Sequence, residues 1–242
     1  MKLKTIFLTM ILLTSCQGEA TSKNTIEVVD LLGRKNQIDL TEERRVVCIG
    51  AGALRLYSYI GDNKDLVGAE DIDRDENANP FSNISRPYYD VNKEFYSTLK
   101  SCGKGGPKNQ LSEAEKILSC NPTLVISEYE DKNASDELEK KISCPVINIR
   151  YGSKSVFDEN IFASFRLLGK VLQKEQRAEE LIDFILNAKS ELEGKALESN
   201  KRCYVGCLGN YGTQDIYSTS LSFPLFEVNK VKNALDIGIP LE

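Results

Sequence analysis

Glycine, arginine and tyrosine residues that could bind a charged ligand gather in four predicted loops. Gly50-Ala51-Gly52 opens a predicted helix that carries Arg55, and free N–H groups at a helix start favour an anion. Segment 71–89 is long and polar, segment 103–107 is glycine-rich, and segment 211–219 follows a later predicted strand. Arginine and tyrosine bind anionic or aromatic groups by charge and stacking, and glycine allows close backbone approach. The predicted ligand contacts are Gly52, Arg55, Arg86, Tyr88, Gly105, Gly106, Tyr211, Ser218 and Thr219.

Each of these residues also has a plainer interpretation. Gly50 to Gly52 could form only a tight turn, and Arg86 could be a solvated loop charge. The carboxylates Asp71 and Asp73 could do acid–base chemistry or bind a hard metal. Their segment lacks the glycine and the terminal glutamate of an EF-hand loop, so a solvated loop is the competing interpretation.

The composition excludes several classes of function. The 242 residues include no histidine, which removes Ser-His-Asp catalysis, His-liganded zinc and His-ligated haem iron. A net charge of −5, with 31 basic and 36 acidic residues mixed along the chain, offers no basic patch for nucleic acid. No protein-bound cofactor or metal is predicted.

The N-terminus has the pattern of a secretory signal that ends just before Cys16. Basic residues at Lys2 and Lys4 precede a short apolar run that ends in Leu13-Thr14-Ser15-Cys16. The run is too short for a stable membrane-spanning helix. Its end resembles the bacterial lipobox, in which the cysteine is acylated and the chain is cut just before it. We therefore predict a signal peptide over residues 1–15, lipidation at Cys16, a polar tether over residues 16–25, and export to the periplasm or cell exterior.

The remaining cysteines are predicted to be structural. Cys48 and Cys144 lie in apolar runs and are expected to be small buried hydrophobic residues. Cys203 and Cys207 lie in a predicted strand, 203–208, that would separate them by roughly 13 Å, too far for one disulfide or one metal ion.

Strands and helices alternate in the first half of the chain. A hairpin is predicted over 26–40, strands over 45–50, 66–68, 123–127 and 145–150, and helices over 53–60, 112–118 and 135–142. Ser112 and Glu115 have the spacing of a capping box. This alternation predicts an α/β fold with a parallel sheet.

Two helical patterns follow from Asp158, the second over 175–197, which would be about 34 Å long and could connect two lobes. A new α/β unit starts at Cys203, with a short helix after Pro224 and a strand over 234–237. The predicted organisation is an N-terminal lobe over 26–157, helices including an interlobe helix over 158–199, and part of a second lobe over 200–242.

In order and spacing, these segments resemble the substrate-binding lipoproteins of ABC transporters for iron complexes and cobalamin. The matching stretches include Val29-Asp30-Leu31-Leu32-Gly33-Arg34, Gly50-Ala51-Gly52-Ala53-Leu54-Arg55, Glu115-Lys116-Ile117-Leu118 into Asn121-Pro122-Thr123-Leu124-Val125-Ile126, Arg177-Ala178-Glu179-Glu180-Leu181-Ile182, and Gly209-Asn210-Tyr211-Gly212. The resemblance covers nearly the whole chain after Cys16. It implies two α/β lobes joined by one long helix, with a ligand held between them.

The resemblance also implies a function without bond chemistry. A lipid-anchored monomer would capture a siderophore, haem or corrinoid chelate and deliver it to an ABC permease with its ATPase. One acidic residue on each lobe would dock on the permease, and the matching positions are Glu115 and Glu227. For Glu115 the alternative is a capping carboxylate.

One departure from that family affects the second lobe. Its members continue for about another hundred residues, so the second lobe is expected to be incomplete here. Two alternatives therefore stay open: a truncated, non-transporting remnant of such a protein, or an enzyme on a similar bilobed scaffold.

Overall fold

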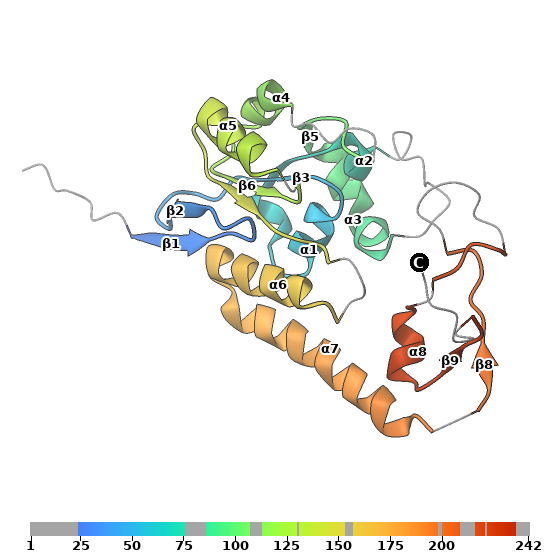
Figure 1. The fold of residues 1–242 in the computed structure, drawn as a ribbon. Helices are drawn as coiled ribbons and strands as arrows, with labels where there is room; N and C mark the ends of the chain where they lie inside the picture. The colour runs from blue at the N-terminus through green and yellow to red at the C-terminus, as the bar shows by residue number, and fades with distance from the viewer. Residues whose placement is uncertain are drawn as a thin grey trace, which may run out of the picture.

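A computed structural model describes residues 24–75, 86–106, 113–129, 131–152, 157–197, 200–208, 216–220 and 222–235. Its first part is a parallel five-stranded sheet with helices on both faces, preceded by a separate antiparallel hairpin (Figure 1). The sheet has the order β5-β4-β3-β6-β7. Its strands are β3 (Val46–Ile49), β4 (Leu66–Ala69), β5 (Lys100–Ser101), β6 (Leu124–Ser127) and β7 (Val146–Asn148).

The apolar strands are buried because helices cover both faces of the sheet. Val46, Cys48 and Ile126 face a core shared with α1 (Ala53–Ser58), α3 (Pro87–Thr98), α6 (Glu159–Leu172) and α7 (Glu175–Lys195). Val47 and Val125 face a second core shared with α4 (Ala114–Ser119) and α5 (Lys132–Ile142). Alternate residues of one strand point to opposite faces, so these runs are apolar at nearly every position. The predicted α/β parallel sheet is confirmed.

The predicted hairpin is confirmed as β1 (Thr25–Val29) paired with β2 (Lys35–Asp39). Its turn depends on Asp30, whose carboxylate accepts the backbone N–H groups of Leu32 and Arg34 at 3.0 and 2.8 Å. Gly33 supplies the positive φ that the turn requires. The backbone N–H of Leu31 donates to the carbonyl of Asn148, which joins the turn to β7.

Segment 71–89 is not the continuous loop that the sequence suggested. It contains α2 (Asp71–Arg74) and the start of α3. A separate 3-10 turn, η1 (Asn63–Asp65), lies earlier in the chain, directly before β4. Pro87 occupies the first turn of α3, where its missing N–H costs nothing, and Tyr89 and Tyr96 are buried seven residues apart on one face. The predicted capping box at Ser112 is also wrong, because α4 begins one residue after Glu113, which makes no side-chain cap bond. Ser112 itself lies outside the described residues.

The long helix is confirmed: α7 packs antiparallel along α6, and its C-terminal end reaches a small unit built from β8 (Arg202–Cys203), α8 (Pro224–Val228) and β9 (Lys232–Asn233) (Figure 1). The predicted strand 203–208 is wrong beyond Cys203, because Cys207 has a left-handed backbone with φ +64°. The second predicted strand lies at 232–233 instead of 234–237, of which residues 236 and 237 are outside the described part. The separation predicted for Cys203 and Cys207 therefore loses its basis, and both are exposed free thiols.

Cys48 and Cys144 are buried, as predicted, and so are Cys102 and Cys120. None of the described helices combines the length and the apolar character that a membrane span requires.

Candidate ligand-binding site

The loops that leave the carboxyl ends of the parallel strands lie along one edge of the sheet. After β3 the chain turns toward β4, whereas β6 lies on the other side of β3, so the strand order reverses between β3 and β6. Open α/β sheets bind ligands at such a reversal. Gly50 has φ +88°, and a Cβ there would lie 3.1 Å from the backbone nitrogen of Glu128, which follows β6. The two loops are therefore packed directly against each other.

Arg55 and Tyr151 form a charged and aromatic pair at this edge. The Arg55 guanidinium carbon lies 5.1 Å from the centre of the Tyr151 ring, and its Nη1 donates to the Tyr151 hydroxyl. Its Nε donates to the hydroxyl of Tyr59 at 3.1 Å. Gly52, with φ +95°, leaves room for Tyr151, because a Cβ there would lie 2.5 Å from the ring. Two of the predicted contacts, Gly52 and Arg55, are thus brought together.

Tyr151 was not predicted from the sequence. The signal that could have found it is an aromatic residue directly after the predicted strand 145–150 and directly before Gly152. The expected anion cradle at the start of α1 is less open than predicted. The helix has only six residues, and the N–H of Ala53 donates back to the carbonyl of Gly50 at 3.2 Å.

Arg86 and Tyr88 surround a buried carboxylate. Arg86 Nη1 lies 2.9 Å from Asp73 Oδ1, and the Tyr88 hydroxyl donates to the same oxygen at 2.7 Å. The guanidinium also lies 4.3 Å from the centre of the Tyr89 ring. Burial raises the pKa of Asp73, while Tyr88 and Arg86 act in the opposite direction. This cluster joins α2 to α3, so Arg86 is a structural counter-ion and not a solvated loop charge; a direct ligand contact stays a prediction.

Gly105 lies over another buried carboxylate, that of Glu70, directly after β4. A Cβ at Gly105 would lie 2.3 Å from Glu70 Oε2, so only glycine fits with this packing. The Tyr129 hydroxyl donates to Glu70 Oε1 at 2.8 Å. Burial raises the pKa of Glu70 to about 7, against the hydrogen bonds from Tyr129 and the backbone of Gly50, and Asp73 and Asp71 raise it further. Glu70 was also missed from the sequence, where it is one polar residue after a strand.

Asp71 and Asp73 do not converge on one point as a metal site would require. Asp71 pairs with Arg74 at 3.2 Å, and Asp73 pairs with Arg86. Across the described ranges, no three Cys, Asp or Glu side chains gather in a metal-binding group. Gly106 has φ +84°, and a Cβ there would lie 3.0 Å from Ile72.

The second-lobe predictions are only partly described. Tyr211 lies outside the described residues. The carbonyl of Ser218 accepts the N–H of Leu208 at 2.9 Å. The hydroxyl of Thr219 is buried without a hydrogen-bond partner among the described residues. These positions stay predictions.

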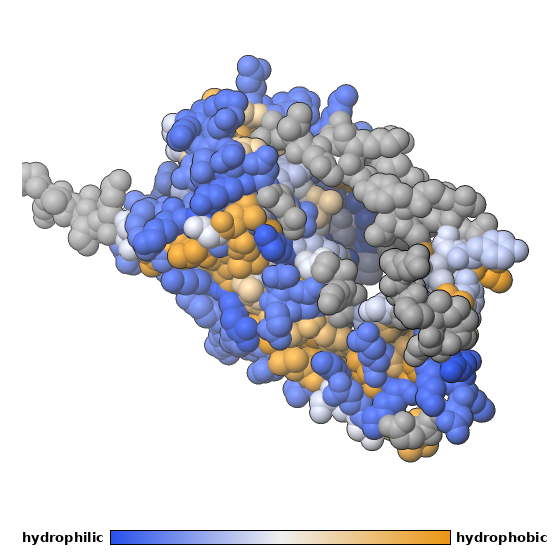
Figure 2. Space-filling view, viewed as in Figure 1, coloured by the Kyte–Doolittle hydropathy of each residue, from blue (hydrophilic) through white to orange (hydrophobic). Residues whose placement is uncertain are grey.

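A pocket of about 600 Å³ lies where α8 faces the helix pair. It is lined by Phe157, Asp158, Glu159, Asn160, Lys189, Glu193, Ser222, Pro224, Glu227 and Val228. The Lys189 ammonium lies 5.5 Å from the centre of the Phe157 ring. Figure 2 shows a mixed surface, with an apolar patch on the first lobe above α6 and further apolar residues along α7 and beside α8.

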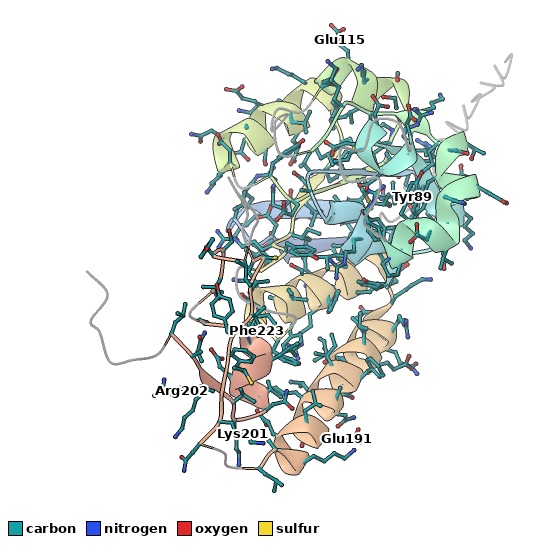
Figure 3. All side chains as sticks on the ribbon, turned by 90° about the vertical axis from the view of Figure 1, so that its right-hand side faces the viewer. Tyr89, Glu115, Glu191, Lys201, Arg202 and Phe223 are labelled. Carbon is teal, nitrogen blue, oxygen red and sulfur yellow. The ribbon has the colours of Figure 1, made fainter. Side chains whose placement is uncertain are left out.

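The two predicted docking carboxylates lie in different surroundings. Glu115 is exposed on α4 and points away from the molecule at the end opposite to α8 (Figure 3). Glu227 is exposed on α8, lines the pocket, and accepts a hydrogen bond from Ser222 at 3.3 Å. Their docking role stays a prediction.

Comparison with known proteins identifies the fold. In the solved structures, a periplasmic solute binding protein from Veillonella parvula is 22% identical with a TM-score of 0.58 over 75% of this chain and 51% of its own. The siderophore binding protein BauB, bound to a complex between two molecules of acinetobactin and ferric iron, is 18% identical with a TM-score of 0.59, over 90% of this chain and 71% of its own. The periplasmic haem binding protein HutB of Vibrio cholerae is 17% identical with a TM-score of 0.54, over 83% and 71%.

The chain spans about half the length of the Veillonella protein. A search of curated proteins finds no match. The family model described as periplasmic binding protein matches residues 46–220, which is most of the chain. Together with the parallel sheet and the long helix, this match shows that the chain belongs to the periplasmic binding protein family.

Proposed function

We propose that this chain is an extracytoplasmic binding protein that captures an iron–siderophore or related metal chelate and delivers it to an ABC permease. The observation that carries the proposal is the Arg55–Tyr151 pair at the strand-reversal edge. It offers a cation and an aromatic ring side by side, which suits an anionic aromatic chelate. In this proposal residues 26–157 form one lobe, 158–199 the connecting helices, and 200–242 part of the other lobe.

Ligand binding is tested by tyrosine fluorescence, since the chain has ten tyrosines and no tryptophan. The purified protein is titrated with a ferric catecholate, a ferric hydroxamate, haemin and a corrinoid. Saturable quenching by one of these supports the proposal, and no response to any of them contradicts it. Arg55→Met should weaken binding by roughly 10- to 100-fold, because it removes a charged hydrogen-bond donor.

A matched control separates binding from general loss of charge. Arg166 on α6 is an exposed arginine that pairs with Glu179 at 2.9 Å, away from the strand-reversal edge. Arg166→Met should leave the affinity within about twofold of the parent, because exposed ion pairs contribute little. Equal losses in both variants would contradict a specific role for Arg55.

We also propose lipid anchoring at Cys16 and docking through Glu115 and Glu227. Cys16 lies outside the described residues, and its assignment rests on the lipobox-like Leu13-Thr14-Ser15-Cys16. Cys16→Ala should abolish labelling with a radioactive fatty acid. Labelling that persists in this variant would exclude Cys16 as the acylated residue.

Glu115→Lys should reduce chelate uptake by cells while leaving chelate binding by the purified protein unchanged, because charge pairs orient docking. Glu137→Lys, an exposed glutamate on the neighbouring α5, is the control. The protein is proposed to act as a monomer, which size-exclusion chromatography with light scattering checks.

The enzyme alternative has less support. Asp71 and Asp73, the carboxylates proposed for acid–base or metal chemistry, are each paired with an arginine, and the family consists of binding proteins. Turnover of a chelate by the purified protein would favour that alternative.

A further inference from the structure

Glu70 lies beneath three of the loops that form the ligand-binding edge. It is 4% exposed, and its carboxylate receives hydrogen bonds from the Tyr129 hydroxyl after β6 and from the backbone of Gly50 after β3. The loop after β5 crosses directly over it, at Gly105. One carboxyl group, which itself follows β4, therefore contacts segments that follow three other strands of the sheet, β3, β5 and β6.

The loop over Glu70 is rich in glycine. Gly103, Gly105 and Gly106 all have positive φ, which places three conformationally permissive residues within four positions. Hydrogen bonds tie the loop to β4, α2 and Glu113, beginning with Cys102 N–H, which donates to Ala69 O at 3.0 Å. Asp71 N–H donates to Gly103 O at 2.8 Å, Ile72 N–H donates to Lys104 O at 3.2 Å, and Lys104 N–H donates to Glu113 Oε1 at 2.9 Å.

Among the residues that the structure describes, the groups that act on Glu70 do not neutralise its charge. Those that act on it or are affected by it are Asp71 and Asp73 on α2, Tyr129 after β6, Cys102 after β5 and Cys48 on β3. None of these is a cation. Arg86 is paired with Asp73. A buried carboxylate without a cationic partner is costly, so its ionised form favours access to water.

We propose that Glu70 is a proton-dependent latch for the loop 102–106 at the ligand-binding edge. When its carboxyl is protonated, the loop stays packed over it. When it is ionised, an arrangement is favoured in which the loop moves aside and water reaches the carboxylate.

The direction and the size of the pH effect on loop opening follow from the linkage between proton binding and the loop equilibrium. The packed arrangement holds the proton with a pKa of about 7, whereas a hydrated carboxyl has the ordinary value of 4.5. Raising the pH through this window therefore favours the open loop. Between pH 5.5 and 8.5 the ratio of open to packed loop should rise by about thirtyfold.

The test is hydrogen exchange of the full ligand-free chain at several pH values from 5.5 to 8.5, with exchange times scaled for the intrinsic rate. Peptides that cover 102–106 should lose protection by about thirtyfold across this range. Glu70→Gln should remove the pH dependence, because the amide does not titrate. Glu113→Gln is the matched control: it touches the same loop at Lys104, but its partners lower the pKa of Glu113, so the pH dependence should remain.

A second variant guards against poor folding of Glu70→Gln. Gly105→Ala places a methyl group where the Glu70 carboxylate lies, so the loop should be poorly protected at every pH. Protection of 102–106 that is independent of pH in the parent, or that keeps the parent's pH dependence in Glu70→Gln, would overturn the proposal. These readouts need no ligand, so their failure is separate from a failure of the proposed function.

Discussion

Arg34 should be among the most important single side chains for the stability of the first lobe. It is 5% exposed, and its Nη1 donates to Val146 O at 2.6 Å, to Asn148 Oδ1 at 2.9 Å and to Asp30 Oδ2 at 3.1 Å. The other guanidinium nitrogens reach Asp136 and Glu139 on α5. One side chain thereby joins the hairpin turn, β7 and α5. Arg34→Met keeps an apolar stem of similar length and removes all of these bonds.

The expected loss comes mainly from the buried partners. Breaking one half of a buried ion pair costs about 3–5 kcal/mol. Asp30 is fully buried but keeps three backbone N–H donors, from Leu32, Arg34 and Asn148, so the lower end, about 3 kcal/mol, is expected. Asp136 and Glu139 are 42% and 35% exposed, and each should contribute less than about 1 kcal/mol.

Urea unfolding followed by far-ultraviolet circular dichroism measures these differences at an unchanged slope. Asp136→Asn and Glu139→Gln are the controls. The double variant Asp30→Asn with Arg34→Met should regain part of the loss, because no uncompensated buried charge remains. A free energy of unfolding for Arg34→Met within about 1 kcal/mol of the parent would refute the reasoning.

Three further predictions concern the same measurement. The folded-state pKa of Glu70 is raised from 4.5 to about 7, so the unfolded chain releases this proton at a lower pH than the folded chain. The free energy of unfolding should therefore fall by about 3 kcal/mol as the pH rises from about 4.5 to 7. In a pH series of urea unfolding, Glu70→Gln should lack this decrease. Gly61→Ala should cost about 1–3 kcal/mol, because the new Cβ would lie 2.2 Å from the buried Tyr57 ring; Gly194→Ala, with nothing within 4 Å, should not destabilise. Asp158→Ala should cost about 1 kcal/mol in thermal or urea unfolding, since its carboxylate caps α6 at the N–H of Asn160.

The parts of the fold that the sequence predicts are those with a strong local pattern. The apolar strands around Val46 and Leu124 and the long helix over 175–195 can be recognised because burial on both sheet faces and on one helix stripe sets their composition. By contrast, α3 has only two buried residues among many polar ones, and β5 consists of Lys100 and Ser101. These two elements are stabilised by tertiary contacts, α3 with α1 and α2, and β5 with β4, and such contacts cannot be read from a local sequence pattern.

The candidate site also combines residues that local sequence indicates with residues that only the fold brings together. Gly52 and Arg55 lie where the sequence predicts them, directly after a strand, because the loop that follows β3 is local in sequence; their role as ligand contacts stays a prediction. Tyr151 and Glu70 reach the same edge from positions 96 and 15 residues away from Arg55, so only the sheet topology brings them there. The buried pair of Asp73 with Arg86 was missed for a related reason: in sequence, both residues belong to a polar stretch typical of solvent.

The four thiols inside the first lobe have a consequence for how the chain matures. Cys48, Cys102, Cys120 and Cys144 are buried, and burial raises the pKa of each, to about 12 for Cys144. Only thiolates react readily with disulfides and oxidants, so the folded lobe protects these groups chemically as well as sterically. In an oxidising compartment, the outcome of maturation then depends on whether folding is faster than thiol oxidation. A lobe that folds quickly keeps these four thiols reduced, whereas a lobe that folds slowly forms non-native disulfides.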